Sequence, residues 1–171
     1  MIGTARRLIG LLALATSLAA ATAHAAGATE GKPIAHFQVK TLDGKTIDSD
    51  QLRGKVVLVN FWATWCPPCR EEMPAFQKYY EAHQGEGFEL IAISTDEKED
   101  LAKVRDAMRA FTYPAGLQAD NDTRAFGRIW TMPMSFVIDR AGIVRKAGWH
   151  SEKTVDDGVL DGLLGAYLKA H

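Results

Sequence analysis

The sequence predicts an α/β fold with a central mixed sheet flanked by helices and a short β extension at its N-terminal side. Two continuous apolar runs, 56–62 and 88–94, have the β-branched and aromatic composition of strands covered on both faces. Segments with helical spacing of apolar residues alternate with these strands, which favours parallel strands joined by crossover helices. A turn at 140–142 then joins two late strands into a hairpin and adds an antiparallel pair.

Length and charge limit the classes of function. The chain has 171 residues, enough for one domain with its own core, and it contains no repeat or low-complexity segment. With 20 basic and 21 acidic residues and a formal net charge of −1, nothing indicates broad electrostatic binding. We therefore expect a monomeric domain without a nucleic-acid partner.

The N-terminal segment has the order of features of a secretory signal. Arg6 and Arg7 precede an uncharged, Ala-rich run over 8–23, and the tripeptide 23–25 (AHA) places small residues where a signal peptidase reads them. The run is shorter than the ~20 apolar residues that a membrane-spanning helix needs. An uncleaved anchor is the alternative.

These features predict the organisation of the chain. We expect residues 1–25 to be a signal peptide cleaved after about Ala25, which places the protein in the periplasm. Residues 26–33 are small and polar and are expected to be a flexible lead-in. Residues 34–171 are expected to form the folded domain.

The first half of the domain contains four elements in order. Ile34–Val39 is expected to be a short edge strand, followed by a turn at 42–45 that Asp-Gly marks. A connection over 52–55 leads into the strand 56–62. Apolar side chains recur at helical spacing over 71–81, in a helix that an internal proline at position 74 should kink.

The second half begins with the strand 88–94. An amphipathic helix over 100–111 and a short strand at 113–118 follow. Asn121 or Asp122 is expected to cap a helix that runs to about Trp130. The hairpin strands are expected at 135–139 and 143–147, and a last helix at a Thr154 cap.

The two cysteines, Cys66 and Cys69, indicate chemistry and not cross-linking. A bridge between residues this close closes too small a loop to stabilise a fold much. The pair follows the strand 56–62 and opens a helical pattern, so Cys66 lies near a helix N-terminus, where unpaired N–H groups and the dipole stabilise a thiolate. Cys66 is therefore the expected nucleophile, and Cys69, one turn on, the resolving thiol.

The residues between the cysteines indicate the direction of electron flow. Pro67 and Pro68 carry no N–H, which leaves chiefly the Cys69 N–H to stabilise a thiolate on Cys66. A poorly stabilised dithiolate favours the disulfide form and makes the reduced protein a better reductant. The expected potential is nearer ~−270 mV than ~−120 mV.

Strand, cysteine motif and a later proline together resemble the thioredoxin superfamily. The elements that carry the resemblance are the strand, the WCPPC motif at 65–69, the proline-containing helix and Met132-Pro133 before a late strand. The segment 59–74 is similar to the extracytoplasmic TlpA/ResA-like branch. That resemblance implies a thioredoxin fold and a thiol–disulfide oxidoreductase, with no cofactor besides the Cys66–Cys69 redox-active disulfide.

The same resemblance implies partners. The branch contains membrane-tethered or periplasmic disulfide reductases, several of which serve cytochrome c maturation or copper-site assembly. Protein thiols and disulfides would be the substrates, and a membrane protein with its own dithiol would be the electron donor.

Residue roles follow by match to the family. Pro133 is the expected cis-proline, and Met132 before it would present backbone to an incoming peptide and its apolar side chain to the sulfurs. Met134 departs from the threonine that commonly follows the cis-proline. Glu72 matches an acidic residue that tunes the cysteines and is the candidate for proton transfer to Cys69.

The remaining residues have both structural and functional interpretations. Asn60 stands where cytoplasmic thioredoxins carry a buried Asp, so Glu72 is expected to have taken over proton handling. Trp65, next to Cys66, is expected to pack and also to shape the docking surface. The expected substrate-binding residues are Trp65, Pro67, Pro68, Met132 and Pro133. Trp130 and Trp149 are interpreted as core or patch residues, and the charged run 96–100 as solvated.

Three alternatives stay open. The same cysteines could serve a thiol oxidant or isomerase, or could bind Cu(I) in a delivery protein with Met73, Met132 or Met134 as further ligands. A peroxidase would need Thr and Arg arranged around one Cys, a pattern absent near Cys66. No histidine has metal-ligand spacing to the cysteine pair, and Arg70 stands where a haem-attachment motif has His, so no metal site is expected.

Overall fold

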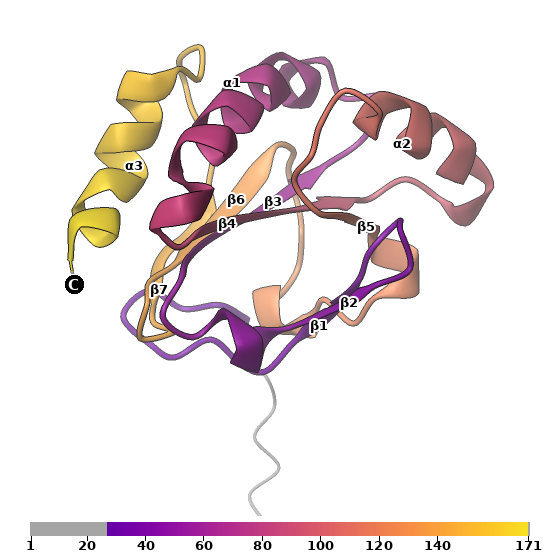
Figure 1. Ribbon diagram of the computed structural model, residues 1–171. Coiled ribbons are helices and arrows are strands. Elements are labelled where there is room, and N and C mark those ends of the chain that lie inside the picture. The colour runs from indigo at the N-terminus through magenta and orange to yellow at the C-terminus, as the bar shows by residue number, and fades with distance from the viewer. Residues whose placement is uncertain (1–26, 171) are drawn as a thin grey trace, which may run out of the picture.

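A mixed sheet forms the centre of the molecule (Figure 1). The computed structural model describes residues 27–170, so the expected signal peptide lies outside the described residues. The sheet has five strands in the order β5-β4-β3-β6-β7. Their bounds are Val56–Trp62 for β3, Phe88–Ser94 for β4, Ala115–Leu117 for β5, Met134–Ile138 for β6 and Val144–Trp149 for β7. β3, β4 and β5 run parallel to one another, whereas β6 is antiparallel to both of its neighbours, β3 and β7. This arrangement confirms the predicted α/β class and mixed sheet.

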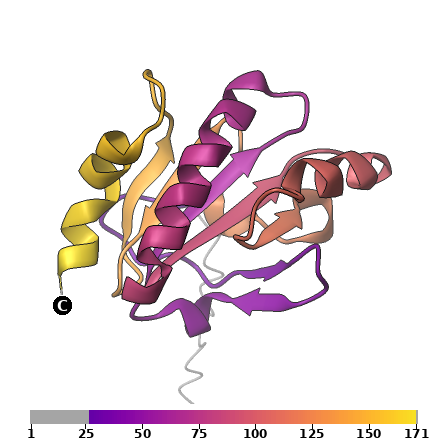
Figure 2. The same cartoon turned by 45° about the horizontal axis from the view of Figure 1, so that its top comes forward.

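Three α-helices are present in residues 27–170: α1 Pro67–His83, α2 Leu101–Met108 and α3 Asp157–Lys169. Alternate side chains of the strands divide the core, as the period of two requires. Leu58 and Leu90 pack with the helices, whereas Val59 and Ile91 pack on the opposite face. Figure 2 shows α1 crossing the sheet with α3 beside it. The helices therefore cover one face, and non-helical segments cover the other.

The N-terminal extension belongs to that second face. β1 Gln38–Lys40 and β2 Thr46–Asp48 form an antiparallel hairpin around the predicted turn, where Gly44 has a φ of +86°. The strand is shorter than the expected 34–39. The expected flexible lead-in is instead hydrogen bonded in its described part: the Gly31 N–H donates to the Val144 carbonyl at 2.8 Å.

The helix expected at 121–130 was wrong. Only a single 3-10 turn, Arg124–Phe126, forms there. The Asn121 side chain does not cap a helix, because it bonds to both backbone groups of Lys40 and to the Leu117 carbonyl. Gly127, with a φ of +77°, ends the turn, and Phe126 packs on aromatic rings of the sheet. Tertiary contacts thus replaced the local helical pattern.

One helix start confirms the expectation and another differs from it. α1 begins at Pro67, directly after Cys66, because proline at the first turn loses no hydrogen bond that the helix could have made. α3 is capped by Asp156 and not by Thr154: the Asp156 carboxylate accepts from the Val159 N–H at 2.9 Å. Within residues 27–170 no helix combines the length and apolar character needed to cross a bilayer.

Arg140 ties three segments together at the edge opposite the cysteines. Its guanidinium donates to the carbonyls of Gly54 at 2.7 Å, Glu86 at 2.9 Å, Leu168 at 3.0 Å and Ala170 at 3.1 Å. Two of these carbonyls lie at the C-terminal end of α3, where a cation is favourable.

Substitution of Arg140 by alanine is expected to lower the free energy of unfolding by about 2 kcal/mol, because four backbone carbonyls lose their donor, that of Leu168 in a part-buried hydrogen bond. Arg140→Lys should recover only part of the loss, since an ammonium lacks the planar fork. Urea titration measures the effect. Arg109→Ala, which removes an exposed ion pair with Asp106, is the matched control and should change little. Equal effects of the two alanine variants would contradict the role of Arg140.

Candidate functional site

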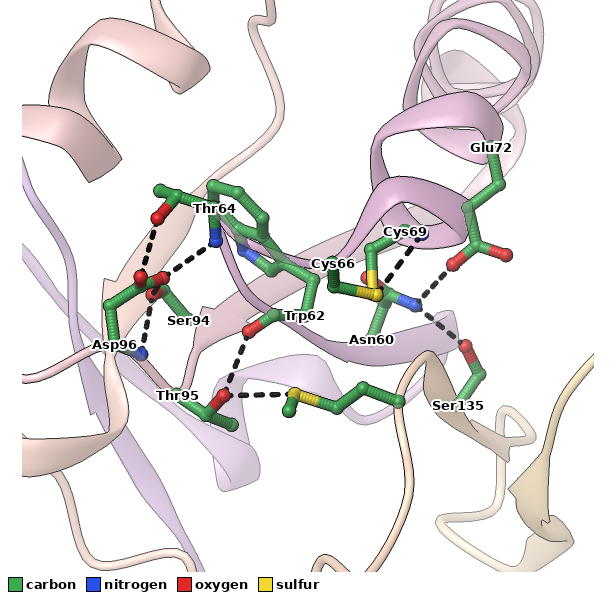
Figure 3. Close-up of a disulfide and its surroundings, with 11 residues drawn as sticks. Asn60, Trp62, Thr64, Cys66, Cys69, Glu72, Ser94, Thr95, Asp96 and Ser135 are labelled. Carbon is green, nitrogen blue, oxygen red and sulfur yellow. Dashed lines mark hydrogen bonds between the residues drawn. A yellow bond between two sulfur atoms is a disulfide. The ribbon is translucent and has the colours of Figure 1, made fainter.

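The cysteine pair lies at the junction of β3 and α1. Cys66 and Cys69 form a disulfide, and Cys66 is the N-cap residue of α1 (Figure 3). The Cys66 Sγ accepts a hydrogen bond from the Cys69 backbone N–H at 3.3 Å. Pro67 and Pro68 occupy the first helical turn and offer no further donor. The predicted placement of Cys66 at a helix N-terminus is confirmed.

Access separates the two cysteines. Cys66 is 4% exposed, whereas Cys69 is fully buried. Both belong to the apolar cluster beneath α1, so the disulfide form exposes less of Cys66 than we expected of a nucleophile. Of the two cysteines only Cys66 keeps any exposed surface.

Exposed apolar side chains surround this point of access. Trp65 is 63% exposed, so it is not a packing residue, and its exposure suits the expected role in a docking surface. Pro67 and Pro68 are also exposed. Trp65 and Pro67 line an open cavity of about 470 Å³, together with Thr64, Arg70 and Glu71.

A second cavity, of about 380 Å³, lies on the other side of Pro68. Met132 and Pro133 line it, and the peptide bond between them is cis, as expected for this position. Glu72 forms part of its wall, and the loop 150–155 completes it. The structure thus brings the predicted substrate-binding residues 65, 67, 68, 132 and 133 to the two sides of the cysteine motif.

Glu72 is buried behind the disulfide. It is only 5% exposed, and its Oε1 accepts a hydrogen bond from Asn60 Nδ2 at 3.0 Å. The same Asn60 amide donates to Ser135 Oγ at 3.0 Å (Figure 3). Burial raises the pKa of Glu72 to about 7, and the Asn60 amide opposes that rise. A carboxyl with this pKa can exchange protons near neutral pH, one helical turn beyond Cys69.

Sequence reasoning missed two polar residues of this region. Ser135 pairs with Asn60 from the neighbouring strand. Asp96, interpreted as part of a solvated run, is only 3% exposed. Its carboxylate accepts from the Thr64 N–H at 2.9 Å, from Thr64 Oγ1 at 2.5 Å and from Ser94 Oγ at 2.7 Å. Carboxyl ends of adjacent parallel strands meet at one sheet edge, and that rule could have placed Asp96 beside the cysteine loop.

The methionines and tryptophans near the site differ in how far they are buried. Met132 Sδ accepts a hydrogen bond from Thr95 Oγ1 at 2.9 Å, and Met73 and Met134 are buried at 3% and 1% exposure. Trp149 packs against the core, whereas Trp130 is 70% exposed and is not a core residue.

One group of possible metal ligands lies on the small N-terminal sheet, away from the cysteines. His36, Asp48 and Asp50 bring ligand atoms within 4.8 Å of one another. Asp48 already accepts from Gln38 and from the Asp50 N–H, and the ring of His36 lies 3.1 Å from it. These contacts account for the cluster without an ion.

Residues 31–147 match the AhpC/TSA family. The chain is 36% identical over 133 residues to thiol-disulfide oxidoreductase ResA of Bacillus cereus, with 76% of each chain covered. It is 30% identical over 146 residues to sporulation thiol-disulfide oxidoreductase A of Bacillus subtilis, covering 82% of this chain and 88% of the relative. A crystal structure of a thiol:disulfide interchange protein from Chlorobium tepidum superposes with a TM-score of 0.70 at 32% identity, covering 82% of this chain and 98% of that one.

Proposed function

Because the chain belongs to the thioredoxin-like AhpC/TSA family and is a thiol–disulfide oxidoreductase, we propose that it reduces disulfides of polypeptides outside the cytoplasm. The Cys66–Cys69 dithiol carries the two electrons, and no other cofactor takes part. The buried Cys69 and the surface access of Cys66 support the division of roles between them.

The proposed reaction has two exchange steps. The Cys66 thiolate attacks one sulfur of the substrate disulfide and expels the other as a thiolate, which takes up a proton. Cys69 loses its proton to Glu72 and attacks Cys66 Sγ. The second substrate sulfur leaves and is protonated, the substrate has gained two electrons and two protons, and the enzyme is left as the Cys66–Cys69 disulfide.

One observation carries the reducing direction. In the described part of the chain, the Cys69 N–H is the only hydrogen-bond donor to Cys66 Sγ. Strong oxidants of this type stabilise their reduced form, because a well-stabilised thiolate is a good leaving group and a poor electron source. With Pro67 and Pro68 unable to donate, the Cys66 thiolate is poorly stabilised, and the dithiol gives up its electrons readily.

A redox titration tests this direction. The Cys66–Cys69 couple is expected near ~−270 mV in glutathione or dithiothreitol buffers, and a value near ~−120 mV would establish an oxidant instead. Pro68→His adds a backbone N–H and an imidazole beside Cys66, so it should raise the potential by tens of millivolts, where 30 mV corresponds to about 1.4 kcal/mol. Ala35→His, at an exposed position of the N-terminal extension, is the control and should leave the potential unchanged.

Location and partners are part of the same proposal. A signal peptide over 1–25 would export the protein to the periplasm, where it would act as a monomer. A reductant in an oxidising compartment must be recharged, so a membrane protein with its own dithiol is the proposed donor. Cytochrome c maturation and copper-site assembly are the proposed pathways, on the resemblance to the TlpA/ResA-like branch.

A further inference from the structure

We propose that the tripeptide Ser94-Thr95-Asp96, at the carboxyl end of β4, holds the cysteine loop and the Met132–Pro133 loop in fixed positions relative to each other. The two loops belong to different strands: the first leaves β3, and the second enters β6. This inference rests on the proposed function, and it assigns positioning residues to that same site.

Asp96 is hydrogen bonded to the cysteine loop, the segment 63–66 that follows β3. Its carboxylate accepts both the backbone N–H and the hydroxyl of Thr64, two residues before Cys66. Ser94 Oγ donates to the same carboxylate and accepts from the Asp96 N–H at 3.1 Å, which fixes the orientation of the Asp96 side chain. A buried carboxylate with three donors is costly to leave unpaired, so the loop is held firmly.

Thr95 fastens the second loop. Its Oγ1 lies 3.2 Å from the Trp62 carbonyl (Figure 3) and 2.9 Å from Met132 Sδ. Its N–H donates to the same Trp62 carbonyl at 2.8 Å. Thr95 therefore contacts the last residue of β3, from which the cysteine loop starts, and the residue before Pro133. One side chain spans both halves of the site.

The backbone of the second loop, residues 128–133, has few hydrogen bonds. Among residues 27–170, no backbone–backbone hydrogen bond holds 128–133, and the β3–β6 ladder begins only at Met134. Met132 is thus held by its side chain, which packs against the core cluster and whose thioether contacts Thr95. If the Met132 backbone pairs with a polypeptide substrate, this contact helps to hold the backbone that the substrate binds, so its loss weakens the binding of a polypeptide and leaves the exchange step itself intact.

Thr95→Val tests the positioning role, because valine keeps the shape of threonine and lacks the hydroxyl. KM for insulin disulfides is expected to rise about threefold to tenfold, the factor of one lost hydrogen bond, with kcat, the redox potential and exchange with the small disulfide 5,5′-dithiobis(2-nitrobenzoic acid) unchanged. Thr95→Ser, which keeps the hydroxyl, should restore the wild-type KM. Thr46→Val, on the exposed face of β2, is the matched control.

Loss of the contact between Thr64 and Asp96 is expected to have a different kinetic effect. Thr64→Val removes the hydroxyl bond to Asp96 and keeps the backbone bond, so it should slow exchange with insulin and with the small disulfide by the same factor. The proposal is overturned if Thr95→Val leaves KM for insulin unchanged, or if it slows both substrates equally. The proposed function fails separately, if the wild-type protein cleaves no insulin disulfide while it still exchanges with the small one.

Discussion

Replacement of Cys69 by alanine is expected to stop turnover and to leave the substrate attached to Cys66 through a stable disulfide. The first exchange needs only Cys66, which keeps a small exposed fraction. The second needs a thiol inside the fold, and Cys69 is the only other cysteine of the chain. Multiple-turnover reduction should fall by roughly a thousandfold or more. Mass spectrometry of the trapped adduct in a periplasmic extract would identify the substrate.

Cys66→Ala is the matched control. It removes the accessible sulfur and leaves Cys69 fully covered, so no adduct should accumulate. Adduct formation on Cys69 in that variant, at the yield of the Cys69→Ala trap, would reverse the two roles. Failure of both variants to form any adduct, with an unchanged circular dichroism spectrum, would contradict nucleophilic exchange itself.

Glu72→Gln is expected to stabilise the protein at neutral and alkaline pH while it impairs exchange. Burial raises the pKa of Glu72 from 4.5 to about 7, so the folded state binds this proton more tightly than the unfolded state. The stability of the wild-type protein therefore declines as the pH rises from about 4.5 through 7, and above 7 the buried carboxylate costs about 3 kcal/mol. Glutamine carries no such cost, so the difference in unfolding free energy should grow by that amount between pH 4.5 and pH 8.

Urea titrations at several pH values measure this difference, and the pH profile of disulfide exchange measures the functional effect. The wild-type profile should have an inflection near pH 7 that Glu72→Gln removes. Glu81→Gln, at an exposed position near the other end of α1, is the control and should alter neither curve. Identical profiles of wild-type and Glu72→Gln would reduce Glu72 to a structural residue.

A gain in stability together with a loss of exchange in Glu72→Gln would show that the buried carboxyl serves the reaction and lowers the stability of the fold. A leucine-like side chain in the place of Glu72 would suit the apolar cluster around the cysteines better. A carboxyl there is held by a single amide from Asn60 and keeps one edge on the cavity beside Pro133. Groups buried with a raised pKa are typical of proton-transfer sites, and they lower the stability of the fold that contains them.

The sequence by itself predicted the features that depend on local pattern. Both long strands, 56–62 and 88–94, have the predicted bounds. A nearly continuous run of apolar and β-branched residues is typical of a strand that is covered on both faces. The position of Cys66 at a helix N-terminus followed from a strand, the cysteine pair and a helical pattern in succession. The parallel and antiparallel pairings followed from the alternation of elements and from the hairpin turn.

Only the tertiary structure decided which polar residues surround that pattern. Asp96 and Ser135 reach the site from strands beside β3, and no local signal distinguishes such a buried polar residue from a solvated one. A helix was expected over 121–130 from its capping residue, yet Asn121 and Phe126 instead make contacts with distant strands. Periodicity is a property of neighbours along the chain, whereas burial and hydrogen-bond partners depend on which strands the fold sets side by side.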